Sequence, residues 1–172
     1  MSDPSQQSPH PSQLQILTRD VQQKIEAARN QSKKIVFVSG IFDLLHEEHV
    51  RFLEKAKAVG DFLIVALESD ARVRIIKGEG RPVQSQEVRQ QSIEKLGVAD
   101  VIFILPDDFA DASKHRRLIE EVRPAILAVS SHSPYLDKKK AIVEEFGGKL
   151  MIVHQHNPAI STTQLLAQKG KK

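Results

Sequence analysis

The feature of this 172-residue chain that most constrains its fold is a regular alternation of short apolar segments with amphipathic ones. Five apolar segments, each bounded by glycine, proline or polar residues, are typical of buried strands. They are Lys34–Gly40, Asp61–Ser69, Ala99–Leu105, Ala125–Ser130 and Lys149–Gln155. Strands that are apolar on both faces occur where helices cover both faces of a sheet. The pattern therefore predicts a Rossmann-like α/β fold with a doubly wound, five-stranded parallel sheet.

The chain is expected to form one folded domain over residues 14–168, flanked by two tails. Residues 1–13 are rich in serine, glutamine and proline and are predicted to be disordered, and 169–172 are a basic C-terminal tail. Apolar residues at helical spacing predict a first helix over 14–30. Further helices are expected over 46–59, 71–76, 87–96, 111–122 and 137–146, and from Ser161 onward.

The composition excludes several functional classes. The chain has no cysteine, so it has no disulfide, thiolate metal site or cysteine nucleophile. Net charge is only +3, and no basic stripe with interleaved aromatic residues is present, so a nucleic-acid partner is not expected and an RNA-binding module is a weak alternative. The N-terminus lacks a secretory signal, and no apolar run approaches the roughly 20 residues of a membrane span. A cytoplasmic protein without a membrane partner is therefore expected.

Polar residues gather directly after the first predicted strand, at the edge of the sheet where ligands of parallel sheets bind. Gly40 and Asp43 are followed by His46 and His49, which lie three residues apart at a helix start and therefore share one face. A helix N-terminus with two imidazoles suits a phosphate group, because free N–H groups and partial positive charge favour anions. An isolated pair of this kind is also compatible with a surface pair or a helix cap.

Together these residues resemble the H-x-G-H nucleotidyltransferase, or cytidylyltransferase-like, superfamily, in which a strand ends in G-x-F-D and runs into H-x-G-H. This chain has GIFD at 40–43 and HEEH at 46–49. The resemblance continues through KGEGRPV at 77–83, EVRQQSIEKLGVADVIFI at 87–104 and ISTTQLL at 160–166, and it covers roughly residues 34–168. Within the superfamily the chain is most similar to the adenylyltransferase of ADP-heptose synthesis and to glycerol-3-phosphate cytidylyltransferase.

The resemblance implies transfer of AMP from ATP, favoured over transfer of CMP from CTP, to a sugar- or polyol-phosphate with release of pyrophosphate. It also implies Mg²⁺ as cofactor and a possible homodimer. The implied catalytic residues are His46, His49 and Lys77. The implied nucleotide-binding residues are Gly40, Ile41, Phe42, Asp43, His49, Arg81, Ser161, Thr162 and Thr163. The implied substrate-binding residues are Arg89, His132 and Tyr135, and Asp43 is the implied metal ligand.

Several of these residues also have a simpler local interpretation. Ser161 or Thr162 could be a plain helix N-cap, which serine and threonine favour. Lys77 could be a solvated charge in a surface loop. Arg89 could contribute only to the charge pattern of an exposed helix face.

The chain departs from the family pattern in two places. Glu48 replaces the motif glycine, and a carboxylate there is expected to repel a triphosphate by roughly 1–4 kcal/mol at about 4 Å unless it swings outward or binds a metal. After the fourth strand, AILAVSSHSPYLDKKK at 125–140 replaces a glycine-containing substrate loop, and its lysines could attract an acceptor phosphate or simply be solvated. These departures motivate an alternative function, a catalytically impaired nucleotidyltransferase fold that serves as a nucleotide-binding or scaffold module.

Overall fold

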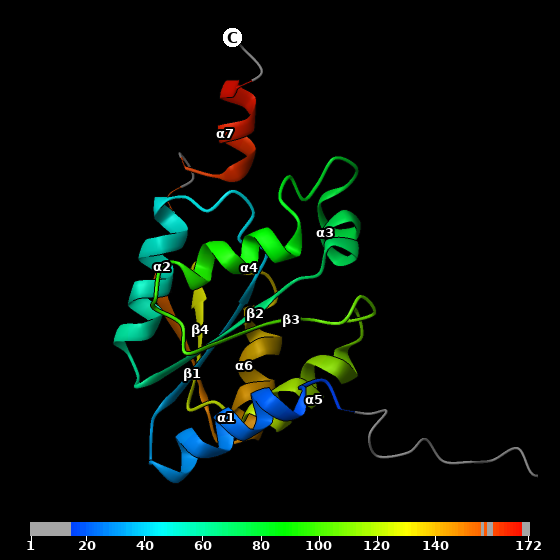
Figure 1. The fold of residues 1–172 in the computed structure, drawn as a ribbon. Coiled ribbons are helices and arrows are strands. Elements are labelled where there is room, and N and C mark those ends of the chain that lie inside the picture. Colours follow the sequence, from blue (N-terminus) through cyan, green and yellow to red (C-terminus); the bar gives the residue numbers. More distant parts are fainter. Residues whose placement is uncertain (1–14, 156, 158–159, 170–172) are drawn as a thin grey trace, which may run out of the picture.

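The computed structural model of the protein describes residues 15–155, 157 and 160–169, so the predicted N-terminal tail lies outside the described residues (Figure 1). Five parallel strands form one sheet in the order β3-β2-β1-β4-β5. The strands are β1 (Ile35–Gly40), β2 (Phe62–Leu67), β3 (Val101–Ile104), β4 (Ile126–Ser130) and β5 (Lys149–His154). The predicted Rossmann-like parallel sheet is confirmed.

Helices connect the strands, and short polar side chains set where most of them begin. The helices are α1 (Arg19–Asn30), α2 (Glu47–Ala58), α3 (Asp70–Lys77), α4 (Gln86–Glu94), α5 (Ala112–Val122), α6 (Leu136–Glu145) and α7 (Thr162–Lys169). Helix α1 begins later than expected, because the Thr18 hydroxyl accepts the N–H of Val21 and caps the helix there. Ser69, Ser85 and Asp111 cap α3, α4 and α5 in the same way. Lys169 ends α7 rather than opening a tail, and 170–172 lie outside the described residues.

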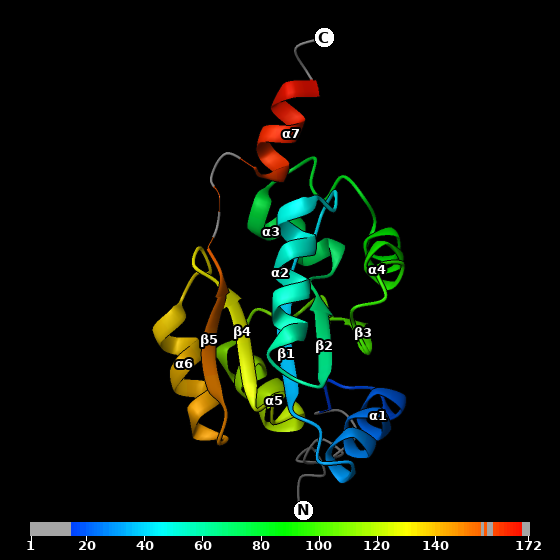
Figure 2. The ribbon, with the colours of Figure 1, turned by 90° about the vertical axis from the view of Figure 1, so that its left-hand side faces the viewer.

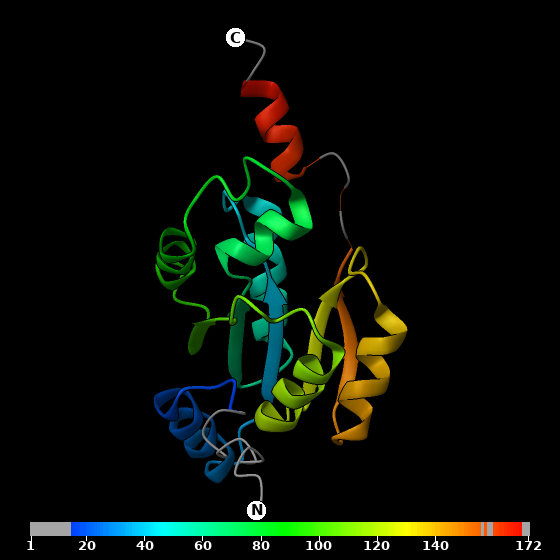
Figure 3. The same ribbon diagram turned by 90° about the vertical axis from the view of Figure 1, so that its right-hand side faces the viewer.

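The sheet is covered on both faces, because alternate residues of each strand face opposite sides. Val36 and Val38 of β1 pack with residues of α2 and α4, whereas Ile35 and Phe37 pack with α1, α5 and α6. Figures 2 and 3 show α2 in front of one face and α5 and α6 in front of the other. This arrangement leaves the carboxyl edge of the sheet to the connections that follow the strands. In the described part of the chain, no helix is long and apolar enough to cross a membrane.

The strand order reverses between β1 and β4, and these two strands part at their carboxyl ends. Their pairing ends at Phe37 with Leu127, although β1 continues to Gly40 and β4 to Ser130. Helix α7 stands beyond this edge and projects away from the sheet in all three views (Figures 1–3). In open parallel sheets such a switch point is where ligands bind, so the fold brings the predicted site to the expected edge.

Candidate active site at the carboxyl edge

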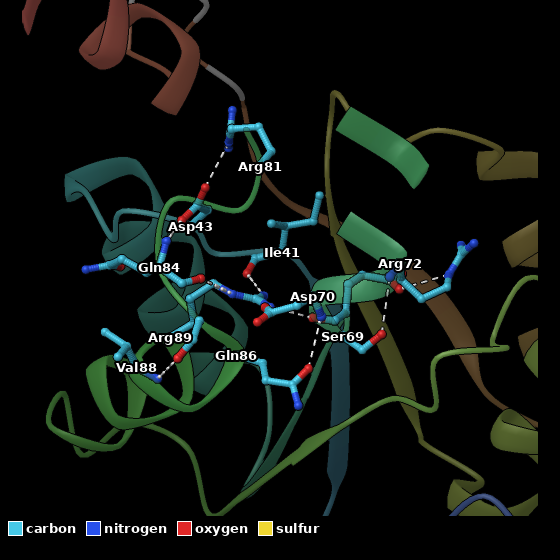
Figure 4. A network of polar contacts seen from close by, with 12 residues as sticks. Ile41, Asp43, Ser69, Asp70, Arg72, Arg81, Gln84, Gln86, Val88 and Arg89 are labelled. Atoms are coloured by element: carbon cyan, nitrogen blue, oxygen red, sulfur yellow. Dashed lines mark hydrogen bonds and ion pairs between the residues drawn. The ribbon is translucent and has the colours of Figure 1, made fainter. Parts of the chain in front are cut away.

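The connection from β1 to α2 is held in place by the carboxylate of Asp43, which is buried. It accepts hydrogen bonds from the Arg81 Nε at 2.9 Å and from the backbone N–H groups of Val83 at 2.9 Å and Gln84 at 3.0 Å (Figure 4). Burial raises the pKa of Asp43, but these three hydrogen bonds outweigh it, so its pKa lies below the usual value. Asp43 therefore fastens the 78–85 loop, with Arg81, to the histidine motif.

The two motif histidines lie together at the start of α2, as predicted. His46 is the residue before the helix, and its ring stacks on that of His49 with centroids 3.8 Å apart and planes 19° apart. The rings of Phe42 and His49 meet in a T-shaped arrangement, with centroids 5.4 Å apart and planes 70° apart. Phe42 has a left-handed backbone with φ of 51°, which a bulky residue adopts only where surrounding contacts hold it. This backbone conformation thus places the aromatic ring of Phe42 beside the histidine pair.

Gly40 was expected to let the backbone approach a nucleotide, and the structure shows an additional reason for glycine there. A Cβ atom on Gly40 would lie 2.7 Å from Cε2 of Phe42, closer than real Cβ atoms come. The absence of a side chain therefore makes room for the Phe42 ring.

The start of α7 is tied to the same connection. The Thr162 hydroxyl donates to the backbone carbonyl of Asp43 at 2.7 Å and is buried there. Ser161 accepts the N–H of Gln164 at 3.2 Å, so it caps the helix in the manner of its simpler local interpretation. Thr163 is exposed. Two helix N-termini, those of α2 and α7, are consequently joined through one short segment at the carboxyl edge.

Glu48 does not swing outward and, within the part of the chain that the structure describes, belongs to no metal-binding cluster, which corrects the expectation for this residue. Its side chain is 6% exposed, and Oε2 lies 2.8 Å from His154 Nε2 at the end of β5. Arg51 Nη1 lies 3.4 Å from the other oxygen, and the backbone N–H of Asn157 also donates to the carboxylate. The hydrogen bond from His154 lowers the pKa of Glu48, burial raises it, and Asn157 and Arg51 lower it further, so the net shift is downward. The carboxylate is thus engaged by groups of the protein itself.

Arg89 is fully buried and connects three segments behind the site (Figure 4). Its guanidinium donates to the backbone carbonyls of Ile41, Glu68 and Gln84 at 2.6, 2.8 and 3.2 Å, and to the carboxylate of Asp70 at 2.8 Å. The interpretation of Arg89 as part of an exposed charge pattern is therefore wrong. Its predicted contact with substrate stays a prediction, while its position accounts for the alignment of the ends of β1 and β2.

Three other predicted residues lie on the surface. Lys77 is the exposed last residue of α3, and His132 is exposed after β4. Tyr135 is 72% exposed and has its ring 5.5 Å from the ammonium group of Lys138. Their predicted roles in catalysis and substrate binding stay predictions.

A second polar cluster, not predicted from the sequence, lies at the carboxyl edge around Glu68. Glu68 directly follows β2, with Arg72 Nε 3.5 Å from its Oε2 and with His115 and Lys139 close enough to act on its charge. Burial raises the pKa of Glu68 and lowers that of Lys139, whose ammonium group donates to Ser133 at 2.7 Å. The position of Glu68 at a strand end was the signal that could have revealed this cluster, since polar strand-end residues of parallel sheets meet at one edge.

The described residues offer little for a resident metal ion. No group of three or more histidine, aspartate or glutamate side chains within that part of the chain could hold one. The carboxylate of Asp43, the predicted ligand, already accepts three hydrogen bonds. The arrangement of these described residues does not fit a metal centre built by the protein.

Comparison with known proteins agrees with the motifs. Residues 37–168 match the family model described as cytidylyltransferase-like. Among curated proteins, the chain is 41% identical over 130 residues to the bifunctional protein HldE of Geobacter metallireducens and 45% identical over 117 residues to HldE of Wolinella succinogenes. These matches cover 75% and 67% of this chain but only 26% and 24% of the relatives. The chain thus spans about a quarter of the length of these curated relatives.

Solved structures share the fold. A lipopolysaccharide core biosynthesis protein from Thermoplasma volcanium superposes with a TM-score of 0.58 at 22% identity, over 73% of this chain and 98% of that protein. A pantoate-β-alanine ligase from Francisella tularensis superposes with a TM-score of 0.54 at 15% identity, over 87% of this chain and 75% of the ligase.

Proposed function

Because the chain belongs to the cytidylyltransferase-like family of nucleotidyltransferases, we propose that it transfers AMP from ATP to a phosphorylated sugar or polyol and releases pyrophosphate. ATP is favoured over CTP by the similarity to the HldE proteins, which agrees with the ADP-heptose branch that the motifs resemble. CMP transfer from CTP is the closest variant of the same reaction.

The observation that carries this proposal is the junction of two helix N-termini beside the stacked histidine pair. Helix α2 begins directly after His46, and α7 begins at Thr162, whose hydroxyl is bonded to the Asp43 carbonyl. Free N–H groups at both helix starts and the partial positive charges of both helices favour an extended polyanion such as a triphosphate.

The reaction requires positioning and charge stabilisation rather than a covalent enzyme intermediate. An oxygen of the acceptor phosphate forms a bond to the α-phosphorus, and the bond between that phosphorus and the bridging oxygen breaks, so that pyrophosphate leaves with both electrons. His46 and His49 hold the oxygens where negative charge develops, Lys77 supplies a compact positive charge, and Ser161–Thr163 bind the β and γ phosphates. Mg²⁺ enters with the triphosphate as part of the substrate, because this ion is commonly bound through phosphates and water.

The acceptor is assigned to the cluster around Glu68. Arg72 and Lys139 place two cations beside one carboxylate, in a position where burial weakens the screening of charge. The cations suit the phosphate of the acceptor, and the carboxylate can accept hydrogen bonds from its hydroxyl groups.

The alternative of a non-catalytic nucleotide-binding or scaffold module rested on Glu48 and on the altered loop after the fourth strand. The carboxylate of Glu48 is engaged by His154, Arg51 and the N–H of Asn157 and therefore faces groups of the protein, which weakens the argument from repulsion. No other contact in the described residues favours that alternative over turnover.

The test is nucleotide binding followed by turnover. Saturating ATP with Mg²⁺ should stabilise the protein by about 2.7 kcal/mol at 100 times Kd, measured by thermal shift, with CTP compared side by side. A pyrophosphate-release screen over sugar and polyol phosphates then identifies the acceptor. Replacing His49 with alanine should lower kcat by about 10²–10³-fold, whereas Lys24→Ala on the exposed surface of α1 serves as control. Absence of stabilisation by either nucleotide at millimolar concentration would overturn the proposal.

A further inference from the structure

Buried polar side chains are concentrated where the β1–α2 connection meets the β5–α7 connection. Six polar or charged side chains are buried in the described part of the chain: Asp43, Glu48, Ser69, Arg89, His154 and Thr162. Ser69 and Arg89 belong to the end of β2 and the helices that follow it. The other four form two ties between the same two connections, Glu48 with His154 and Asp43 with Thr162. Because burying an unpaired polar group costs free energy, this concentration of paired groups indicates that the two connections are fixed to each other here.

The first tie depends on a local irregularity in β5. Leu150 packs on the α1, α5 and α6 side of the sheet, and Met151 and Val153 pack on the α2 side. Strict alternation would turn His154 away from α2. The register between β4 and β5 shifts at this point, since Val129 pairs with Ile152 but Ser130 pairs with His154. The extra residue turns His154 toward α2, in the way that bulges re-aim side chains.

The hydrogen bonds of His154 define its tautomer. Lys55 Nζ lies 3.3 Å from Nδ1, and an ammonium group can only donate, so Nδ1 accepts. The proton of the neutral ring is then on Nε2, which donates to Glu48 Oε2 at 2.8 Å. The carboxylate of Glu48, which only accepts hydrogen bonds, therefore completes the series of hydrogen bonds that runs from Lys55 through His154 to α2.

The second tie holds the other end of the same connection. His154 is the last residue of β5 and Thr162 is the first residue of α7, and both are bonded to the short segment 43–48. The N–H of Asn157, between them in the chain, also donates to Glu48. Helix α7 projects from the body instead of lying across the sheet (Figures 1 and 2), so these ties, rather than broad packing, set where it starts.

We propose that Glu48 is a positioning residue of the nucleotidyl transfer reaction: with His154 it clamps the end of β5 to the start of α2, and so holds Ser161–Thr163 in register with His46 and His49. The inference rests on the proposed function of this site. It reverses the expectation drawn from the motif, because the residue that replaces glycine supports the triphosphate site. Glycine at 48 would leave the Nε2–H of His154 and the N–H of Asn157 without their acceptor.

The experiment compares Glu48→Gly, Glu48→Gln and His154→Leu with the matched control Glu47→Gly. Glu47 lies in the same helical turn, is exposed and pairs with Arg51, so its variant reproduces the loss of charge and helix propensity. Glu48→Gly should raise the KM for ATP about tenfold with a smaller change in kcat, because the phosphates held by α7 are bound equally in the ground and transition states. Glu48→Gln, which keeps one acceptor oxygen, should lie between Glu48→Gly and the wild type.

A second readout needs no nucleotide. Hydrogen exchange of the Asn157 amide should become about tenfold faster or more in Glu48→Gly and should stay unchanged in Glu47→Gly. The double variant Glu48→Gly/His154→Leu removes both partners of the clamp and should raise the KM for ATP no further than Glu48→Gly alone, because the tie is already lost in the single variant. Should Glu48→Gly destabilise the whole domain, Glu48→Gln supplies the same comparison at milder cost.

The proposal is overturned if Glu48→Gly leaves the KM for ATP unchanged or lowers it, as repulsion by the carboxylate would require. It is equally overturned if Asn157 exchange in Glu48→Gly matches that of the wild type. If the wild type binds neither ATP nor CTP, the proposed function fails. The clamp is then judged by Asn157 exchange alone.

Discussion

Replacing Arg89 with methionine separates a structural role from a role in substrate binding. Methionine has a similar length and no hydrogen-bond donor, so the carbonyls of Ile41, Glu68 and Gln84 and the carboxylate of Asp70 lose their partner. In the variant, the carboxylate of Asp70 can bind water because its side chain is 26% exposed. The three carbonyls lie around a guanidinium that is fully buried in the wild type. Removing one partner from such a buried pair costs about 3–5 kcal/mol.

That loss should appear as thermal destabilisation. A protein of this size loses about 2–4 °C of Tm per kcal/mol, so Arg89→Met should melt about 6–20 °C lower than the wild type in a thermal scan. Arg89→Lys keeps the charge but not the planar set of donors and should fall between the two. Arg74, exposed on the neighbouring α3, provides the control Arg74→Met, with a change of roughly 0.5 kcal/mol or less.

The KM for the acceptor distinguishes a structural role of Arg89 from a role in substrate binding. If Arg89 acts through the alignment of the ends of β1 and β2, the KM for the acceptor should change little at temperatures where the variant is folded. A large rise in that KM without a change in Tm would refute the structural reasoning and support the predicted substrate contact.

Two further outcomes follow from the carboxyl edge. Because the pKa of Asp43 is depressed in the folded state, its contribution to stability is present above its unfolded pKa, near 3.9, and is lost as pH falls through the folded pKa. The Tm of the wild type should therefore be constant near neutral pH and should fall below about pH 4. The Tm difference between the wild type and Asp43→Asn should shrink over the same pH range, and a growing difference would contradict this reasoning. Lys139→Met should raise the KM for the phosphorylated acceptor about tenfold and leave the KM for ATP unchanged. Lys24→Met on the exposed surface of α1 is the control, and equal effects on the KM of both substrates would remove the acceptor assignment.

Much of the fold could be predicted because its signals are local. Strands buried on both faces are apolar throughout, as in β2, where every residue is buried. Glycines and capping residues mark most of the element ends, and the structure moves these ends by only a few residues. The family and the meeting of His46 with His49 were also predictable, because the motif is contiguous in sequence and its spacing on a helix is fixed.

The roles of buried charged residues were not predictable, because they depend on partners far away in the chain. Asp43 binds groups about 40 positions away, and Glu48 finds His154 106 positions away. The alternation of β5 predicts that His154 faces away from α2, but a register shift at the end of the strand turns its side chain to the opposite face of the sheet. The local sequence thus predicts that a carboxylate in a phosphate motif repels the ligand, whereas the structure shows this carboxylate held by groups of the protein.

The location of these buried charges has a consequence for how the site tolerates change. Each holds a segment of the carboxyl edge whose own backbone is irregular: Asp43 lies between Phe42 and Leu44, which both have positive φ. Such segments lack the ladders of hydrogen bonds that hold strands and helices, so side chains must supply the fixed points. A new tie such as that of Glu48 to His154 can then replace the close backbone contact that a glycine allows, provided that both partners are present. We therefore expect glutamate at this motif position to require a hydrogen-bond donor at the end of β5.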